Sequence, residues 1–202
     1  MKITLIRHGK TQSNVEHRYQ GAIDDPLCQA GIDFITEWSM KKPYDFPERL
    51  VCSPKLRCLQ TAKLFFPEFP EKDYLIEEQV KESNFGIFEG KNHQELQNDP
   101  VYVKWLASNG EDPIPGGESK GQMSQRCIEG FRRQVCQALR DGIHTLTFVV
   151  HGGTIMALME RFAFPAKLFY EYYIGNGEGF TFTIDNWSDE GRYPVTKISP
   201  EE

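Results

Sequence analysis

The sequence predicts an α/β protein, a three-layer α/β/α sandwich with a mostly parallel central sheet and a small cap over one rim. Three observations support this prediction. Short apolar and β-branched runs recur along the chain, helical stretches follow two of them directly, and two of them end in a histidine followed by glycine. Strands that alternate with helices are typical of parallel sheets, and in such sheets ligands gather at the carboxyl ends of the strands.

The first apolar run, residues 2–6, predicts a buried strand that ends in Arg7, His8 and Gly9. The polar loop that follows brings the amide of Asn14 within a few residues of this tripeptide. We therefore expect a candidate nucleophile, a guanidinium and an amide close together at the carboxyl end of one strand.

The second apolar run, residues 49–52, predicts a short strand that is followed by a helix over residues 54–66. Ser53 is expected to cap this helix, with proline at the first helical position. Because Ser53, Arg57 and Thr61 are spaced by four residues, they share one face of the helix, and the side chain of Arg57 points towards the helix start.

The composition changes between Glu82 and Glu118, where glycine, proline, asparagine and aromatic residues become frequent. One short helical stretch is predicted there, at residues 100–106. We interpret residues 82–117 as a cap-like insertion within a single domain that spans residues 1–202. An amphipathic helix over residues 119–139 follows, because apolar residues recur there at every fourth position.

The third apolar run, residues 145–150, ends in His151 and Gly152 and is followed by a helix at residues 155–162. This arrangement repeats that of the first strand. If the two strands are neighbours in the sheet, their terminal histidines lie at the same rim. Two further strands are predicted at residues 179–184 and 193–198, the last of them at the edge of the sheet.

The bulk composition indicates a folded globular protein that binds no polyanion. Apolar residues make up 39% of the chain and aromatic residues 12%, and the formal net charge is −6. A nucleic acid or an anionic membrane surface would require an excess of basic residues, so neither is expected as a partner. The chain has no signal peptide and no run of about 20 apolar residues, which predicts a cytoplasmic protein.

No metal ion or other cofactor is predicted, because the chain contains no HxxxH, HExxH or DxDxDG pattern. Three histidines outside the apolar-run motifs, His17, His93 and His144, are expected to be surface or hydrogen-bonded polar residues. The cysteines are odd in number and lack CxxC pairs, so we expect reduced thiols in the core. They are Cys28, Cys52, Cys58, Cys127 and Cys136.

The run from Arg7 to Thr11, together with Asn14, resembles the signature Arg-His-Gly-x-Thr/Ser-x-x-Asn of the histidine phosphatase superfamily, in its phosphoglycerate mutase-like branch. The resemblance extends over most of the chain. Segments that match the family in the same order are Gln20-Gly21, residues 25–31, residues 53–62, Glu82 with residues 85–90, residues 115–119 and His151-Gly152-Gly153.

The resemblance implies that His8 attacks phosphorus and forms a phosphohistidine, and that Glu82 protonates the leaving oxygen and later activates water. A neutral imidazole suits this attack, since a phosphate monoester carries close to two negative charges. The family comparison also implies catalytic roles for Arg7, Arg57 and His151, which stabilise the charge on the phosphoryl oxygens. The substrate-binding residues implied are Arg7, Asn14, Gln20, Gly21, Arg57, His151 and Gly152.

The function that these features predict is metal-independent hydrolysis of a phosphate monoester, a small phosphorylated metabolite. The cap is short, and a short cap gives water better access to the site. The family comparison implies a longer insertion at this place in the cofactor-dependent mutases. In the segments that contain Lys10 and Phe88, the sequence most resembles the α-ribazole phosphatase group. Enzymes of that group remove the 5′-phosphate of α-ribazole phosphate late in cobalamin assembly. The alternatives are a cofactor-dependent phosphoglycerate mutase and a catalytically silent phospho-ligand binder, although a silent binder is expected to have lost His8 or Glu82. Whether two copies of the chain form a homodimer is left open by the sequence.

Overall fold

A seven-stranded mixed sheet forms the centre of the molecule in the computed structural model, which describes residues 1–200. The strands lie in the order β3-β2-β4-β1-β6-β7-β5. Neighbouring strands from β3 to β1 run parallel, and β6 is antiparallel to both β1 and β7. Their bounds are Lys2–Arg7 (β1), Arg49–Cys52 (β2), Leu75–Ile76 (β3), Thr145–Val150 (β4), Ala163–Phe164 (β5), Gly179–Thr183 (β6) and Tyr193–Ile198 (β7). The predicted α/β fold with a mostly parallel sheet is confirmed.

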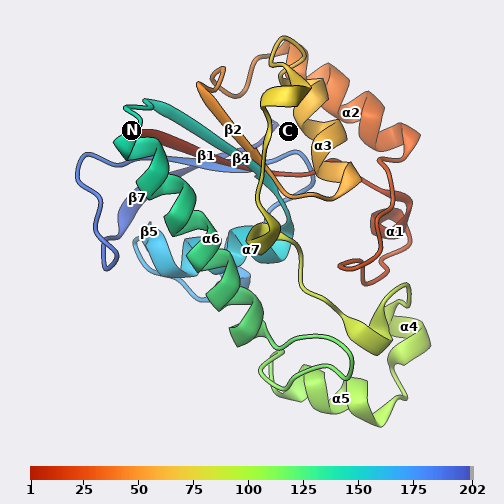
Figure 1. The fold of residues 1–202 in the computed structure, drawn as a ribbon. Coiled ribbons are helices and arrows are strands. Elements are labelled where there is room, and N and C mark those ends of the chain that lie inside the picture. Colours follow the sequence, from red (N-terminus) through yellow and green to blue (C-terminus); the bar gives the residue numbers. More distant parts are fainter. Residues whose placement is uncertain (201–202) are drawn as a thin grey trace.

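Helices cover both faces of this sheet, which gives the three layers (Figure 1). Helices α2 and α3 pack on one face with Ile6, Leu50 and Val149, and helices α6 and α7 pack on the other with Leu5 and Phe148. The helices are α1 (Gln12–Val15), α2 (Gln29–Met40), α3 (Leu56–Phe65), α4 (His93–Leu96), α5 (Pro100–Ala107), α6 (Lys120–Arg140) and α7 (Gly152–Phe162). Short 3-10 turns lie at Glu71–Asp73, Glu78–Val80, Gly86–Phe88 and Phe169–Tyr172.

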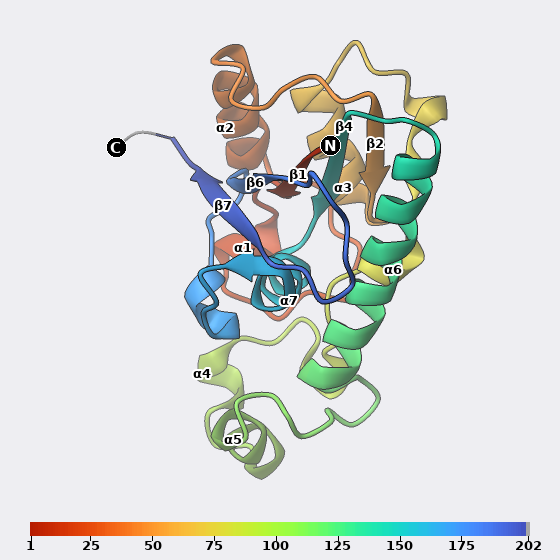
Figure 2. The same cartoon turned by 90° about the vertical axis from the view of Figure 1, so that its left-hand side faces the viewer.

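Strands β1 and β4 are central neighbours because both are apolar on their two faces and must be covered on each side. They pair in parallel, with Arg7 opposite Val150 at the end of the ladder. His8 and His151 therefore leave the sheet at the same rim, as the sequence predicted. Figure 2 shows β1 between β4 and β6, near the middle of the sheet.

The segment that carries α4 and α5 lies away from the sheet, beyond the start of α6 (Figures 1 and 2). It has a small apolar cluster of its own, in which Phe88, Leu96, Tyr102 and Ile114 are buried. Tyr19 reaches this cluster from the loop after β1 and packs against it. We call these five residues the cap cluster.

Two predicted details are wrong, and two short strands were not predicted. Helix α3 begins at Leu56 with Lys55 as N-cap, so the prediction that Ser53 caps it is wrong: the Ser53 hydroxyl lies 2.7 Å from His151 Nε2 instead. The prediction that residues 193–198 form the edge strand is also wrong, because β5 pairs with β7 on its outer side. Strands β3 and β5 have two residues each, too few to produce a hydrophobic period in the sequence.

The cysteines and two of the histidines outside the motifs lie as follows. All five cysteines are free; Cys52, Cys58 and Cys127 are buried, and the other two are half-buried. His144 is exposed, and His93 Nδ1 lies 3.0 Å from the hydroxyl of Tyr102. None of the helices within residues 1–200 has the length and apolar character needed to cross a bilayer.

Candidate active site

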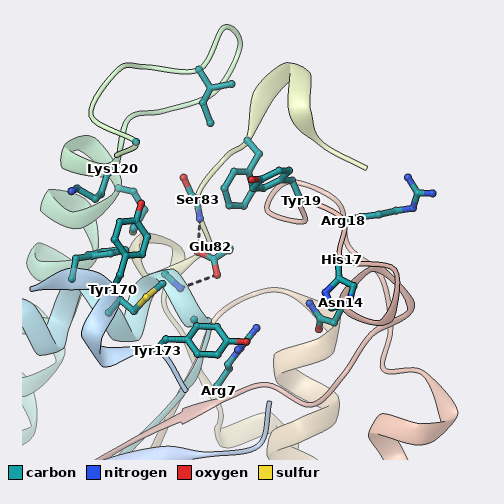
Figure 3. Close-up of a pocket in the computed structure, with 18 of the residues that line it drawn as sticks. Arg7, Asn14, His17, Arg18, Tyr19, Glu82, Ser83, Lys120, Tyr170 and Tyr173 are labelled. Atoms are coloured by element: carbon teal, nitrogen blue, oxygen red, sulfur yellow. Dashed lines mark hydrogen bonds between the residues drawn. The ribbon is translucent and has the colours of Figure 1, made fainter. Parts of the chain in front are cut away.

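A cavity of about 1040 Å³ opens between the rim of the sheet and the cap segment. Four of the predicted catalytic and substrate-binding residues line it: Arg7, Asn14, Glu82 and Gly152. The other predicted site residues are not part of its lining; they are His8, Gln20, Gly21, Arg57 and His151. Figure 3 shows the carboxylate of Glu82 near the centre, with Arg7 beneath Tyr173 on one side and Asn14 on another.

His8 is almost completely buried, with 4% of its surface exposed, beside Arg7 at the end of β1. Its Nδ1 lies 2.7 Å from the carbonyl oxygen of Gly9. Because a carbonyl can only accept, Nδ1 carries the proton and Nε2 keeps its lone pair. Burial, followed by the positive charges of Arg57 and Arg7, holds the pKa of His8 well below its usual value, against the opposing effect of the Gly9 carbonyl. The neutral imidazole is thus the stable form of this side chain.

His151, at the end of β4, faces His8 from the neighbouring strand. The ring centroids are 5.2 Å apart and the rings are steeply inclined, at 67°. The Nε2 of His151 lies 2.7 Å from the Ser53 hydroxyl, which fixes the rotation of the ring. His151 is fully buried, and this burial, followed by the charge of Arg57, lowers its pKa well below the usual value.

Arg57 carries a fully buried positive charge that has no carboxylate partner within residues 1–200. Its guanidinium donates to the carbonyl of Ile23 at 2.9 Å and, more weakly, to that of Gln20 at 3.5 Å, while Nε has no partner. Buried arginines are normally paired with anions, since an isolated buried charge is costly. This arrangement fits a site that receives its anion from a ligand.

Arg7 is the second guanidinium at the rim, and it is also outside any ion pair in the described part of the chain. It donates one hydrogen bond to the carbonyl of Ile174 at 2.5 Å, and the ring of Tyr173 lies over it with the centroid 5.3 Å away. Its Nε is buried without a partner. A Cβ at Gly152 would lie 3.3 Å from this Nε, so the glycine leaves the approach to Arg7 open.

Glu82 is held by backbone groups at the edge of the cavity (Figure 3). Its two carboxylate oxygens accept from the N–H of Ser83 at 2.9 Å and from that of Gly153 at 3.1 Å. A Cβ at Gly153 would lie 2.2 Å from the carboxylate, so any other residue there would displace Glu82. The start of α7 and the acid-bearing segment are therefore built to meet.

Of the neutral donors predicted from the sequence, Asn14 is available to a ligand at the cavity and Gly21 is not. Asn14 lines the cavity. Gln20 is buried; its Oε1 accepts from the hydroxyl of Thr11 at 2.8 Å, and its Nε2 has no partner within residues 1–200. The N–H of Gly21 donates to the carboxylate of Glu89 at 3.0 Å, and a Cβ at Gly21 would lie 1.6 Å from the Ser83 carbonyl. Gly21 therefore serves close chain packing, and its N–H is not available to a ligand.

Several residues at the site were missed in the sequence. Asn176 and Tyr173 come from the segment before β6, and His17 lines the cavity although it had been set apart from the motifs. Arg126, on α6, donates to the backbone carbonyl of Glu82 at 2.9 Å. Their involvement depends on which distant segments meet in space, and the only sequence signal was the polar residue just before a strand, at Asn176.

Comparison with known proteins assigns this geometry to a family. Residues 3–189 match the model of the histidine phosphatase superfamily (branch 1). The adenosylcobalamin/alpha-ribazole phosphatase of Salmonella typhimurium is 26% identical, over 88% of this chain and 87% of the relative, and phosphoglycerate mutase-like protein 4 of Arabidopsis thaliana is 28% identical, over 93% and 85%. The crystal structure of the alpha-ribazole phosphatase from Shigella flexneri superimposes with a TM-score of 0.81 at 25% identity, covering 98% of this chain and 96% of the other.

Proposed function

The chain belongs to branch 1 of the histidine phosphatase superfamily, and we propose on that basis that it hydrolyses a phosphate monoester through a phosphohistidine formed on His8. One observation carries the proposal: Arg57 is fully buried near two neutral imidazoles and has no anionic partner among residues 1–200. A phosphoryl group bound against His8 supplies the missing negative charge. Each charge-assisted hydrogen bond to its oxygens contributes about 1.5–3 kcal/mol.

In the first step, Nε2 of His8 attacks phosphorus, so that a P–N bond forms as the P–O bond to the leaving group breaks. Arg7, Arg57 and His151 stabilise the charge that spreads over the other phosphoryl oxygens. Glu82 gives its proton to the leaving oxygen.

In the second step, the carboxylate of Glu82 takes a proton from water, and the resulting hydroxide attacks phosphorus while the P–N bond breaks. Phosphate is released, and His8 returns to its neutral state. General acid–base catalysis of this kind contributes about 10²–10⁴-fold in rate. The Gly9 carbonyl keeps the proton on Nδ1 throughout, so Nε2 is the reacting atom in both steps.

The aromatic part of the cavity supports a substrate with a large, mostly uncharged leaving group. Its wall contains the aromatic side chains of Tyr19, Trp105 and Tyr170. Two of the cations that line the cavity are already engaged: Arg18 pairs with Glu16 and Glu95, and Lys120 pairs with Glu111 at 2.6 Å. We therefore propose α-ribazole 5′-phosphate, whose leaving group carries a planar aromatic base, as the substrate. A bisphosphorylated mutase substrate would need a second anion site here.

The test is phosphate release in the presence of EDTA by the wild type and by His8→Ala and Arg57→Gln. The substrate panel contains α-ribazole 5′-phosphate, 3-phosphoglycerate, sugar phosphates and nucleotides. We expect wild-type release with α-ribazole 5′-phosphate preferred, no release by His8→Ala, and a loss of at least about 100-fold in kcat/KM for Arg57→Gln. The exposed His144→Ala is the matched control and should behave as the wild type.

Covalent labelling separates the chemistry from simple binding. After incubation with a substrate carrying radiolabelled phosphate and rapid quenching, the label should remain on the wild type and not on His8→Ala. Isomerisation of 3-phosphoglycerate without phosphate release would replace the hydrolase proposal with a mutase. Binding of phosphate without either reaction would identify a silent binder.

A further inference from the structure

Asn176 lies between the Phe169–Tyr172 turn and β6, 168 residues after His8, yet it contacts the loop that carries the nucleophile. Its Nδ2 lies 2.9 Å from the carbonyl oxygen of His8 and 3.2 Å from Oδ1 of Asn14. A third, longer contact of 3.4 Å reaches the carbonyl of Gly9. The same short segment holds Arg7 through the carbonyl of Ile174.

The chemistry of the partners fixes the orientation of both amides. The carbonyl of His8 can only accept, so the atom of Asn176 that faces it must be the NH₂ group. On the other side, the backbone N–H of Thr11 can only donate, so the atom of Asn14 that faces it at 3.2 Å must be the oxygen. The oxygen of Asn14 thus accepts from both Thr11 and Asn176.

The consequence is that the NH₂ group of Asn14 is the only part of this amide left for a ligand. Within residues 1–200 it makes no hydrogen bond, and Asn14 lines the cavity on the side opposite Lys120 and Tyr170 (Figure 3). If the amide turned by 180°, its oxygen would face the phosphate, and a carbonyl dipole repels an anion that an N–H would bind.

We propose that Asn176 is a positioning residue that fixes the amide of Asn14 with its NH₂ group towards the phosphoryl group of the substrate. The inference rests on the proposed function, together with the substrate-binding role that the family resemblance implies for Asn14. Asn176 itself need not touch the substrate: it acts through the oxygen of Asn14, and its bond to the His8 carbonyl keeps the two segments in register. The active-site loop after β1 is therefore completed by a residue from the last 30 positions of the chain.

The test is a double-mutant cycle with Asn14→Ala, Asn176→Ala and the double variant, in which both phosphate affinity and kcat/KM are measured. Loss of one charge-assisted donor predicts that Asn14→Ala weakens the binding of inorganic phosphate by about 10- to 100-fold. Asn176→Ala should weaken it by about 5- to 20-fold in the wild-type background. In the Asn14→Ala background, Asn176→Ala should have less than about a twofold further effect, because the residue it acts through is absent.

Asn176→Asp sharpens the test, because it keeps the shape and places a carboxylate against two acceptor oxygens. The amide of Asn14 can then satisfy this carboxylate only by turning its NH₂ group away from the phosphate, so the loss should equal or exceed that of Asn14→Ala. The control is Asn186→Ala, an exposed asparagine after β6 whose side chain makes no hydrogen bond within residues 1–200, and it should match the wild type.

Equal losses from Asn176→Ala in both backgrounds would overturn the inference, as would wild-type affinity in Asn176→Ala and Asn176→Asp. Inorganic phosphate binding is measured by titration calorimetry and requires no turnover. If the wild type binds phosphate but hydrolyses no monoester, the proposed function fails while the binding cycle still decides the role of Asn176. Absence of phosphate binding by the wild type would overturn both.

Discussion

The two histidines at the rim are neutral because of where they lie. His8 and His151 are buried; the positive charges of Arg57 and Arg7 act on His8, and that of Arg57 acts on His151. A proton on either ring would lose its hydration and be repelled by the guanidiniums, so the folded protein excludes it. Burial and the arginines that we propose bind the phosphate thus keep the proposed nucleophile, His8, neutral.

We predict that the protein loses stability as the pH falls below about 6.5, the ordinary pKa of histidine. In this range the unfolded chain takes up protons on His8 and His151 that the folded chain cannot accept, because both folded pKa values are lowered. Stability from this source is complete above pH 7 and falls by up to about 1.4 kcal/mol per pH unit for each histidine. Urea unfolding at pH 7.5, 6.5 and 5.5 measures the slope.

His8→Asn serves as the comparison for this prediction, since asparagine fits a similar space and does not titrate. Its unfolding free energy should fall less steeply between pH 6.5 and 5.5 than that of the wild type. Identical slopes for the two proteins would show that His8 exchanges protons equally in the folded and unfolded chains.

At the scale of elements, α6 connects the core to the acid-bearing segment through Arg126. Its guanidinium donates to the backbone carbonyls of Gln79, Lys81 and Glu82 at 2.7–2.9 Å, and it pairs with Glu118. Three carbonyls of an irregular segment are thus held by one planar group. This anchor fixes the stretch of chain from which the carboxylate of Glu82 projects.

We predict that Arg126→Lys impairs the step in which Glu82 donates a proton more than it impairs phosphate binding. A lysine cannot hold three carbonyls and a carboxylate at once, so Glu82 should lose its alignment. For substrates with an alcohol leaving group, kcat/KM should fall by about 10- to 100-fold, whereas nitrophenyl phosphate, whose leaving group needs no proton, should be much less affected. Arg140→Ala, at the far end of the same helix, is the control. An equal loss on both substrates would assign Arg126 a purely structural role.

The elements also show what the sequence can and cannot predict. Strands at residues 49–52 and 145–150 were predicted with their observed bounds, because a continuous apolar run between polar residues leaves little choice. Serine is a residue type that often caps helices, but the hydroxyl of Ser53 contacts the ring of His151, 98 residues away. Asn176 and Arg126 reach the site only through such long-range packing, which no local pattern records.

At the scale of the whole molecule, the cap segment is joined to the body by Tyr19. Its ring packs against Phe85 and Trp105 with centroids 5.0 and 5.7 Å away, and its hydroxyl lies 2.8 Å from that of Tyr102. Its backbone also pairs with the chain around Gly90 and Lys91. The loop after β1 therefore carries both the predicted nucleophile and the side chain that completes the cap cluster.

We predict that Tyr19→Ala loosens the cap without unfolding the core. Removal of a packed aromatic ring costs about 3–5 kcal/mol when the ring is fully buried and less at this half-buried position. Because that cost falls on a small cluster, amide hydrogen exchange should accelerate in residues 86–117 and remain slow in β4 and α6. KM for a large leaving group should rise. Phe46→Ala, which removes a ring packed against Phe66 and Phe69, should leave the cap unaffected; acceleration throughout the chain would contradict the prediction.

The central place of β1 determines when the site can exist during synthesis. Strand β1 is synthesised before both of its partners in the sheet, β4 and β6, which come after residue 144. The emerging chain must keep this apolar segment unpaired until residues 145–150 have been made, which is a period of exposure to aggregation and to chaperones. A truncated or stalled product that lacks β4 cannot bring His8 and His151 to the same rim of the sheet.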